Sequence, residues 1–215
     1  MSITASLGAL LSPGRVLTRP LELAAYASDA SFYTLTPAAV VRPVDTVEVK
    51  ALFAWSHRQR VPLTFRAAGT SLSGQAITNG VLIDLSRHWR TLEILDGGAR
   101  VRVGPGIVGG IVNAHLARHG AKLGPDPASM AACMIGGIVA NNSSGMCCGI
   151  EHNAYRTLAS LRFVLPSGTE VDTAAPGAEE SFAAAEPAIA AGLMALKSRV
   201  EGDPRLVERI RTKHR

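Results

Sequence analysis

Charged and aromatic residues are scarce in this chain, and the shortage argues against one class of function. Aromatic residues make up only 5% and charged residues only 18% of the 215 residues, whereas 47% are hydrophobic. Nucleic-acid-binding proteins usually combine clustered basic residues with aromatic side chains that stack on bases. Here the net charge of +5 comes from lysines and arginines scattered along most of the chain. We therefore expect a globular protein with a sizeable core and no nucleic-acid partner.

Cysteines are few, and long apolar runs are missing. Cys133, Cys147 and Cys148 lack the paired C-x-x-C spacing of a zinc site, so we predict no metal site and three reduced thiols. No apolar run approaches the ~18 residues of a membrane span, and the N-terminus lacks the basic start of a signal peptide. We expect a soluble cytoplasmic protein, either free or peripheral at the inner face of the membrane.

The hydrophobic pattern mixes helical and strand periods and predicts an α+β fold. Two short helical pieces come first, followed by a compact strand–helix–strand–loop–strand lobe. A strand hairpin, a helix, a second hairpin and two further helices complete the pattern. The expected parts are a helical segment at 1–35, a first lobe at 36–88 and a second lobe at 89–215.

A loop rich in glycine and serine follows the predicted strand 63–66. Gly69 and Gly74 have the spacing of a P-loop, but Gln75 and Ala76 stand where that motif requires Lys and Ser or Thr. The missing Lys argues against a nucleoside triphosphatase. Backbone N–H groups of small residues can still converge on an anion, so the loop is a candidate phosphate site. A plain turn between two elements is the alternative.

A second glycine pattern, G-x-G-x-x-G, runs from Gly104 to Gly109 and lies between a predicted strand and a predicted helix. Asp126 follows at a distance suited to a ribose partner in a dinucleotide fold. Pro105, however, removes an N–H group from the turn, and no strand follows the helix. We interpret the pattern as a turn into a helix, with an NAD site as the alternative.

The stretch 124–145 is long, rich in small residues and nearly uncharged, unlike an ordinary surface loop. Gly136 and Gly137 permit close approach, and Asn141, Asn142 and Ser143 offer amide and hydroxyl groups. We interpret the stretch as backbone that lies against a large apolar ligand. A buried helix with a glycine packing contact is the alternative.

Four side chains near these stretches are candidates for a ligand or catalytic role. Tyr26, Asp29 and Tyr33 precede the first lobe, and we interpret them as a packed edge. His152 follows the second stretch, and we interpret it as structural because the histidines are too scattered for metal spacing.

The two stretches together resemble the FAD-binding domain of the vanillyl-alcohol oxidase or PCMH type. This domain occurs in FAD-linked oxidases such as D-lactate, glycolate and D-2-hydroxyglutarate dehydrogenases. Residues 66–74 resemble the pyrophosphate loop of the family, residues 135–145 its flavin-flanking loop, and residues 158–172 its next hairpin. The resemblance covers about residues 36–185 and implies a two-lobed FAD-binding domain that is C-terminally incomplete.

The resemblance also implies which residues contact FAD. The expected cofactor contacts are Arg66, Ala67, Ala68, Gly69, Thr70, Ser71, Leu72, Pro125, Ser129, Gly136, Gly137, Ala140, Asn141, Asn142, Ser143 and Gly145. Covalent members carry a flavin-linking histidine where Thr70 stands, so the resemblance implies noncovalent FAD. No catalytic residue is expected in this chain, because the family's later glycine-rich segment and its cap domain would follow residue 215.

The implied activity is the oxidation of a 2-hydroxy acid, whose α-hydrogen passes as hydride to the flavin while a base removes the hydroxyl proton. The subgroup that the chain resembles carries an iron–sulfur region after the FAD-linked oxidase region. The resemblance therefore implies the front part of a longer enzyme, with cap and iron–sulfur domains downstream and an electron acceptor that the sequence does not identify. A noncatalytic nucleotide-binding or partner-binding module is the alternative.

Overall fold

The computed structural model describes residues 2–12, 14–147 and 149–213. It divides into two compact units, Met1–Thr157 and Leu158–Arg215, and each combines helices with short strands. The α+β class expected from the sequence is therefore confirmed. The lobe boundaries at residues 35 and 88 stay a prediction.

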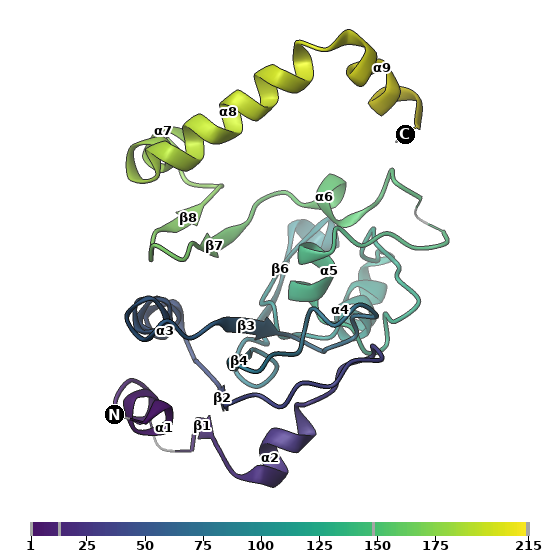
Figure 1. Cartoon of the computed structure of the whole chain (residues 1–215). Coiled ribbons are helices and arrows are strands. Elements are labelled where there is room, and N and C mark those ends of the chain that lie inside the picture. The colour runs from purple at the N-terminus through teal and green to yellow at the C-terminus, as the bar shows by residue number, and fades with distance from the viewer. Residues whose placement is uncertain (1, 13, 148, 214–215) are drawn as a thin grey trace. The chain divides into compact units, whose positions relative to one another are not determined.

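A four-stranded sheet forms the centre of the first half of the first unit (Figure 1). Its strands, in spatial order, are β1 (Val16–Leu17), β2 (Ala39–Val41), β4 (Val81–Asp84) and β3 (Leu63–Arg66). β1 is antiparallel to β2, whereas β2, β4 and β3 are parallel to one another. The helices of this region are α1 (Ile3–Gly8), α2 (Pro20–Ala25) and α3 (Thr46–Gln59).

The central strand β4 is buried on both faces, which explains its unbroken apolar sequence. Val81 and Ile83 pack on α1 and α3, which lie on the same side of the strands in Figure 1. Leu82, which points to the opposite face, packs against Val40 and the partly buried Tyr26. Asp45 caps α3, since its carboxylate accepts a hydrogen bond from the N–H of Glu48 at 2.9 Å.

The second half of the first unit has its own hydrophobic cluster, built from a hairpin and short helices. The elements are β5 (Leu92–Leu95), the 3-10 turns η1 (Asp96–Gly98) and η2 (Ala117–His119), β6 (Arg100–Val103), α4 (Gly109–Leu116), α5 (Ile135–Ala140) and α6 (Ala154–Thr157). Within 124–145, helix α5 matches the alternative interpretation of a buried helix with a glycine packing contact, since Gly136 lies against Pro105. Ile135 and Ile138 bury one face of it against Val112 and Leu116, and this packing favours the helix despite its two glycines.

The glycine pattern 104–109 serves packing. β6 pairs antiparallel with β5, so among the described residues the pattern is not part of a βαβ unit. A Cβ at Gly106 would lie 2.1 Å from the carbonyl oxygen of Leu85, and one at Gly104 would lie 2.5 Å from that of Trp89. The interpretation as a turn into a helix is confirmed, and the geometry gives no support to an NAD site.

The second unit begins with the expected hairpin, and three helices follow. Its elements are β7 (Arg162–Val164), β8 (Glu170–Asp172), α7 (Ala178–Ala185), α8 (Pro187–Glu201) and α9 (Pro204–Lys213). A groove of about 320 Å³ between hairpin and helices is lined mainly by apolar side chains such as Phe163, Phe182 and Leu193.

Two further sequence expectations concern membrane spans and thiols. In the part of the chain that the structure describes, no helix has both the length and the apolar character needed to cross a bilayer. Cys133 is buried and Cys147 is exposed, and both are free thiols. Cys148 lies outside the described residues.

Candidate functional site

The predicted phosphate loop is the connection between the parallel neighbours β3 and β4. Since both strands run in the same direction, the chain must return from the end of β3 to the start of β4, and residues 67–80 make this crossing without a helix. Gly69 and Gly74 have φ values of +70° and +78°, a region that glycine enters without steric cost. The crossing is therefore a compact turn of the kind predicted from the sequence.

The backbone amides of residues 67–72 have no hydrogen-bond acceptor within the described residues. Most of these residues are only partly exposed, so their N–H groups need water or a ligand as a partner. Successive unpaired N–H groups in a turn form a favourable site for an anion. The hydroxyl of Ser71 is hydrogen-bonded to the side chain of Gln75, and contact of Ser71 with a cofactor stays a prediction. The loop fits a phosphate group through its backbone.

The exposed face of α5 is the second part of the candidate site. Gly137, Ala140 and Asn141 are exposed, and their spacing places them on one face of the helix. A Cβ at Gly137 would have no neighbour within 4 Å, so the backbone there is open to a ligand. The side-chain amide of Asn141 donates to the hydroxyl of Ser143 at 3.1 Å and is thereby oriented.

Other predicted contacts in this stretch have partners inside the protein. Gly136 lies against Pro105, since an added Cβ would be 2.8 Å from the ring carbon of that proline. Asn142 has a φ of +47°, and its side-chain oxygen accepts from the N–H of Tyr155 at 2.9 Å. Ser143 is buried. Their geometry accounts for these residue types structurally, and their contact with a cofactor stays a prediction.

The remaining predicted positions are Pro125, Ser129 and Gly145, and Gly145 lies against the residue that follows Pro125. Pro125 is buried, and the carbonyl of Ser129 accepts hydrogen bonds from two backbone N–H groups at 2.7 Å each. Gly145 lies against Asp126, whose Oδ1 is buried and has no hydrogen-bond partner among the described residues. The absence of a side chain at Gly145 is what lets the two segments approach.

A short path of backbone contacts connects the two parts of the site. The carbonyl oxygen of Arg66 accepts from the N–H of Leu85 at 3.0 Å. The carbonyl of Leu85 in turn lies against Gly106, and the carbonyl of Pro105 accepts from the N–H of Gly136 at 2.9 Å. Hence the base of the phosphate loop and the start of α5 are both attached to the same tight turn.

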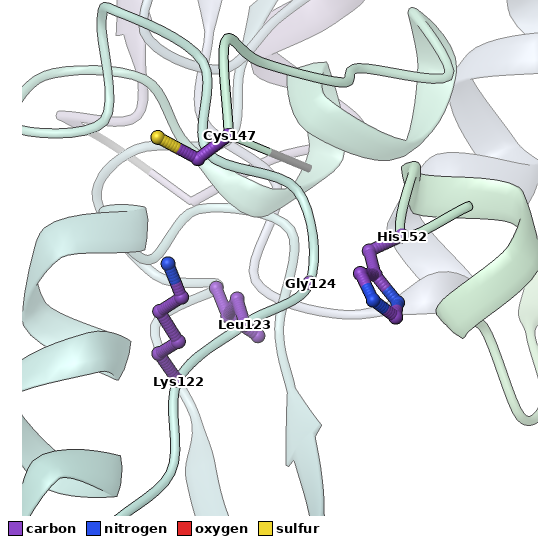
Figure 2. Close-up of a pocket in the computed structure, with 5 residues that line it drawn as sticks. All are labelled: Lys122, Leu123, Gly124, Cys147 and His152. Carbon is purple, nitrogen blue, oxygen red and sulfur yellow. The ribbon is translucent and has the colours of Figure 1, made fainter. Parts of the chain in front are cut away.

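A pocket of about 250 Å³ lies beside the second stretch and was not predicted as a unit (Figure 2). It is lined by Lys122, Leu123, Gly124, Cys147 and His152. In this view the amino group of Lys122 points toward the segment that carries Cys147. His152 lies on the other side of the Gly124 backbone from Lys122. The sequence analysis considered only His152 of these residues for a ligand or catalytic role, because no local pattern joins positions 122–124 to positions 147 and 152.

Asp84, at the end of β4, connects the sheet to the segment before the first lobe. Its carboxylate accepts hydrogen bonds from the Tyr26 hydroxyl at 2.7 Å, from Nε of Arg42 at 3.0 Å and from the Ser86 hydroxyl at 2.6 Å. Burial by itself raises the pKa of Asp84, but the hydrogen bonds from Ser86, Tyr26 and Arg42 together lower that pKa below its ordinary value. Asp84 is thus ionised and fixes Tyr26 against the sheet.

A backbone crossing with unpaired amides follows the parallel strand β3, and α5 adds a helix face with an exposed glycine; this arrangement fits a domain that binds a phosphate-containing cofactor. Residues 37–174 match the family described as FAD binding domain. This match covers more than half of the chain, so the chain belongs to that family. FAD is the cofactor that the match indicates, as the sequence resemblance implied.

Curated relatives include enzymes that act on hydroxy acids. Glycolate oxidase subunit GlcD from Escherichia coli (strain K12) is 40% identical over 140 residues, which are 63% of this chain and 28% of that protein. D-2-hydroxyglutarate dehydrogenase from Haemophilus influenzae is 30% identical over 166 residues, 75% of this chain and 16% of that protein. The chain spans less than a third of the length of either relative.

Solved structures share the fold at low sequence identity. Alkyldihydroxyacetonephosphate synthase aligns with a TM-score of 0.67 and 22% identity, over 78% of this chain and 33% of that chain. 6-Hydroxy-D-nicotine oxidase from Arthrobacter nicotinovorans aligns with a TM-score of 0.67 and 19% identity, over 76% of this chain and 36% of that chain. The fold is therefore the expected PCMH-type FAD-binding fold, of which the chain spans only part.

Proposed function

We propose that this chain is the FAD-binding portion of a flavin-dependent oxidoreductase that oxidises a 2-hydroxy acid of the D-lactate or glycolate kind. The observation that carries the proposal is the row of unpaired amides at residues 67–72 in a chain that belongs to an FAD-binding family. The substrate class is taken from relatives named for glycolate, D-2-hydroxyglutarate and D-lactate. All three compounds are 2-hydroxy acids.

In this proposal the chain's own residues bind and orient the cofactor. The amides of residues 67–72 donate to the pyrophosphate oxygens, because small residues leave the backbone accessible to an anion. The open face of α5 at Gly137 and Ala140 lies along the apolar part of the cofactor. When bound, FAD supplies the acceptor for the hydride of the substrate's α-carbon.

We further propose that FAD is held without a covalent bond. A residue that links flavin covalently at this position would need a nucleophilic imidazole. Thr70 stands there instead and carries only a hydroxyl. Acid precipitation of the flavin-loaded protein tests this point. Yellow colour in the supernatant is the expected result, and flavin that stays in the protein pellet would contradict it.

The rest of the proposed enzyme lies outside these residues. We propose that the catalytic base, the substrate-binding side chains and a cap domain follow residue 215. Iron–sulfur domains are proposed as further partners, and the proposal names no electron acceptor. A cytoplasmic location, either free or peripheral at the inner face of the membrane, completes the proposal.

Flavin content is the first experiment. The purified full-length protein should show flavin absorbance, or gain thermal stability when FAD is added. Gly69→Ala and Gly97→Ala form a matched pair, because both glycines have positive φ values, +70° and +64°. A Cβ at Gly69 would lie 2.6 Å from the Arg66 guanidinium, whereas Gly97 has nothing within 4 Å.

Both substitutions force an alanine into the left-handed region at a cost of ~1 kcal/mol. Only Gly69→Ala should lower FAD affinity, by about tenfold or more, because it displaces the loop that carries the amides. Wild-type protein that neither contains flavin nor gains stability from FAD would contradict the proposed cofactor role.

The substrate class is tested on the same full-length protein. Under anaerobic conditions, D-lactate, glycolate and D-2-hydroxyglutarate are added singly, and the flavin absorbance is followed. At least one should bleach the flavin, because hydride transfer reduces it. Bound flavin that none of the three reduces would refute the proposed substrate class while leaving cofactor binding intact.

A further inference from the structure

A segment that precedes the family match lies against the phosphate loop. We call residues 26–33 the N-terminal strap; the match begins only at residue 37. The N–H of Ala30 donates to the carbonyl of Gly69 at 3.0 Å, which ties the strap to the first turn of the loop. At the other end of the loop, the N–H of Ala76 donates to Oδ2 of Asp29 at 3.3 Å.

Arg66 attaches the strap to the end of β3. Its Nη1 donates to the carbonyls of Tyr26 and Ser28 at 3.2 and 2.9 Å, and its guanidinium lies 5.6 Å from the centre of the Tyr26 ring. The same guanidinium packs beneath Gly69. The guanidinium of Arg66, which the family resemblance predicts to contact the cofactor, therefore also holds the strap and the loop together.

Asp29 and Tyr33 hold the far side of the loop. Oδ1 of Asp29 also accepts from the N–H of Ser31 at 2.8 Å, which fixes the carboxylate where Ala76 can reach it. Burial raises the pKa of Asp29, but the hydrogen bonds from Ser31 and Ala76 and the charge of Arg66 bring that pKa below its ordinary value. The Tyr33 ring lies against Gly74, where an added Cβ would be 2.9 Å away.

We propose that Asp29 is a positioning residue for FAD: through Ala76 and the strap it holds the amides of residues 67–72 converged before the cofactor arrives. The inference rests on the proposed function of the loop. A loop fixed in its binding conformation loses less conformational freedom on binding, at ~1–2 kcal/mol for each residue that need not be ordered. Losing the tie at Ala76 should therefore weaken FAD binding rather than the fold as a whole.

The test compares Asp29→Ala with Asp45→Ala in the full-length protein. Asp45 matches Asp29 because its carboxylate also accepts a backbone N–H, that of Glu48 at 2.9 Å, but it caps α3 instead of contacting the loop. Apoprotein is prepared for each variant, its melting temperature is measured, and the FAD dissociation constant is determined by flavin fluorescence at a temperature where all variants are folded.

Asp29→Ala should raise the dissociation constant about tenfold, whereas Asp45→Ala should lower the melting temperature and leave the dissociation constant unchanged. Asp29→Asn keeps one acceptor oxygen, so it should weaken binding by a smaller factor, and it also serves if Asp29→Ala does not fold. Wild-type affinity in both Asp29 variants, or an equal loss in Asp45→Ala, would overturn the inference. A wild-type protein that binds no FAD would overturn the proposed function and this inference with it.

Discussion

Replacing Asp84 by asparagine should destabilise the first unit in a way that depends on pH. The side chain changes little in shape but loses its charge and one of its two acceptor oxygens. One oxygen can still accept from Ser86. The new NH₂ group then faces two donors, the Tyr26 hydroxyl and Nε of Arg42.

The magnitude follows from the burial of the Asp84–Arg42 ion pair. The Asp84 side chain is 3% exposed and that of Arg42 is 24% exposed, with 3.0 Å between Oδ2 and Nε. Breaking a fully buried pair costs ~3–5 kcal/mol, and solvent at Arg42 reduces this penalty. We expect Asp84→Asn to lower the free energy of unfolding by about 2–3 kcal/mol at neutral pH.

The pH dependence has a definite sign. The pKa of Asp84 is lowered in the folded protein, so the unfolded chain binds the proton more readily. The contribution of Asp84 is therefore fully present above the unfolded pKa of ~3.9 and is lost as the pH falls through the folded pKa. The difference in unfolding free energy between wild type and Asp84→Asn should shrink in that acidic range.

Urea denaturation of the apoprotein between neutral and acidic pH measures this difference. The fluorescence of Trp55, which is 2% exposed in the core beside the same sheet, reports unfolding of this region. Asp96→Asn is the control, because the Asp96–Arg100 pair is exposed and should contribute little at any pH. A neutral-pH loss under ~0.5 kcal/mol, or a loss that stays constant into acid, would refute the reasoning.

Two further predictions concern packing in the first unit. Gly106→Ala should prevent stable folding or cost more than ~3 kcal/mol, because its Cβ would lie 2.1 Å from the carbonyl of Leu85. Gly110→Ala is the control and should cost clearly less, because its Cβ would lie 3.2 Å from the nearest atom; equal melting temperatures for the two variants would contradict the described turn. Leu82→Ala should cost ~2–5 kcal/mol in urea denaturation, because Leu82 is fully buried in the central strand. Leu21→Ala, at an 85% exposed position, should cost almost nothing, and similar losses at both positions would count against the assigned core.

Local chemistry made much of the fold predictable. The strand–helix–strand–loop–strand order of the first lobe forms as expected, because signals such as the unbroken apolar run of β4 and the Asp45 cap of α3 are carried by neighbouring residues. The glycine-rich turn after β3 was predictable for the same reason, because small residues after a short strand need no distant partner to be recognised, and its phosphate role stays a prediction. Helix α5 was only the alternative interpretation, since two adjacent glycines disfavour a helix and packing of Ile135 and Ile138 compensates for them.

The sequence by itself determined strand β3, the glycine-rich crossing that follows it and, through family resemblance, the cofactor. The tertiary structure alone decided which predicted contacts have partners inside the protein, that Arg66 binds the N-terminal strap, and that Asp84 joins Tyr26 to Arg42. The physical reason is the distance along the chain over which each kind of interaction acts. Propensity, capping and turn chemistry act between near neighbours. The Asp84 carboxylate, by contrast, can accept from Tyr26 and Arg42 only after folding has brought these distant positions together.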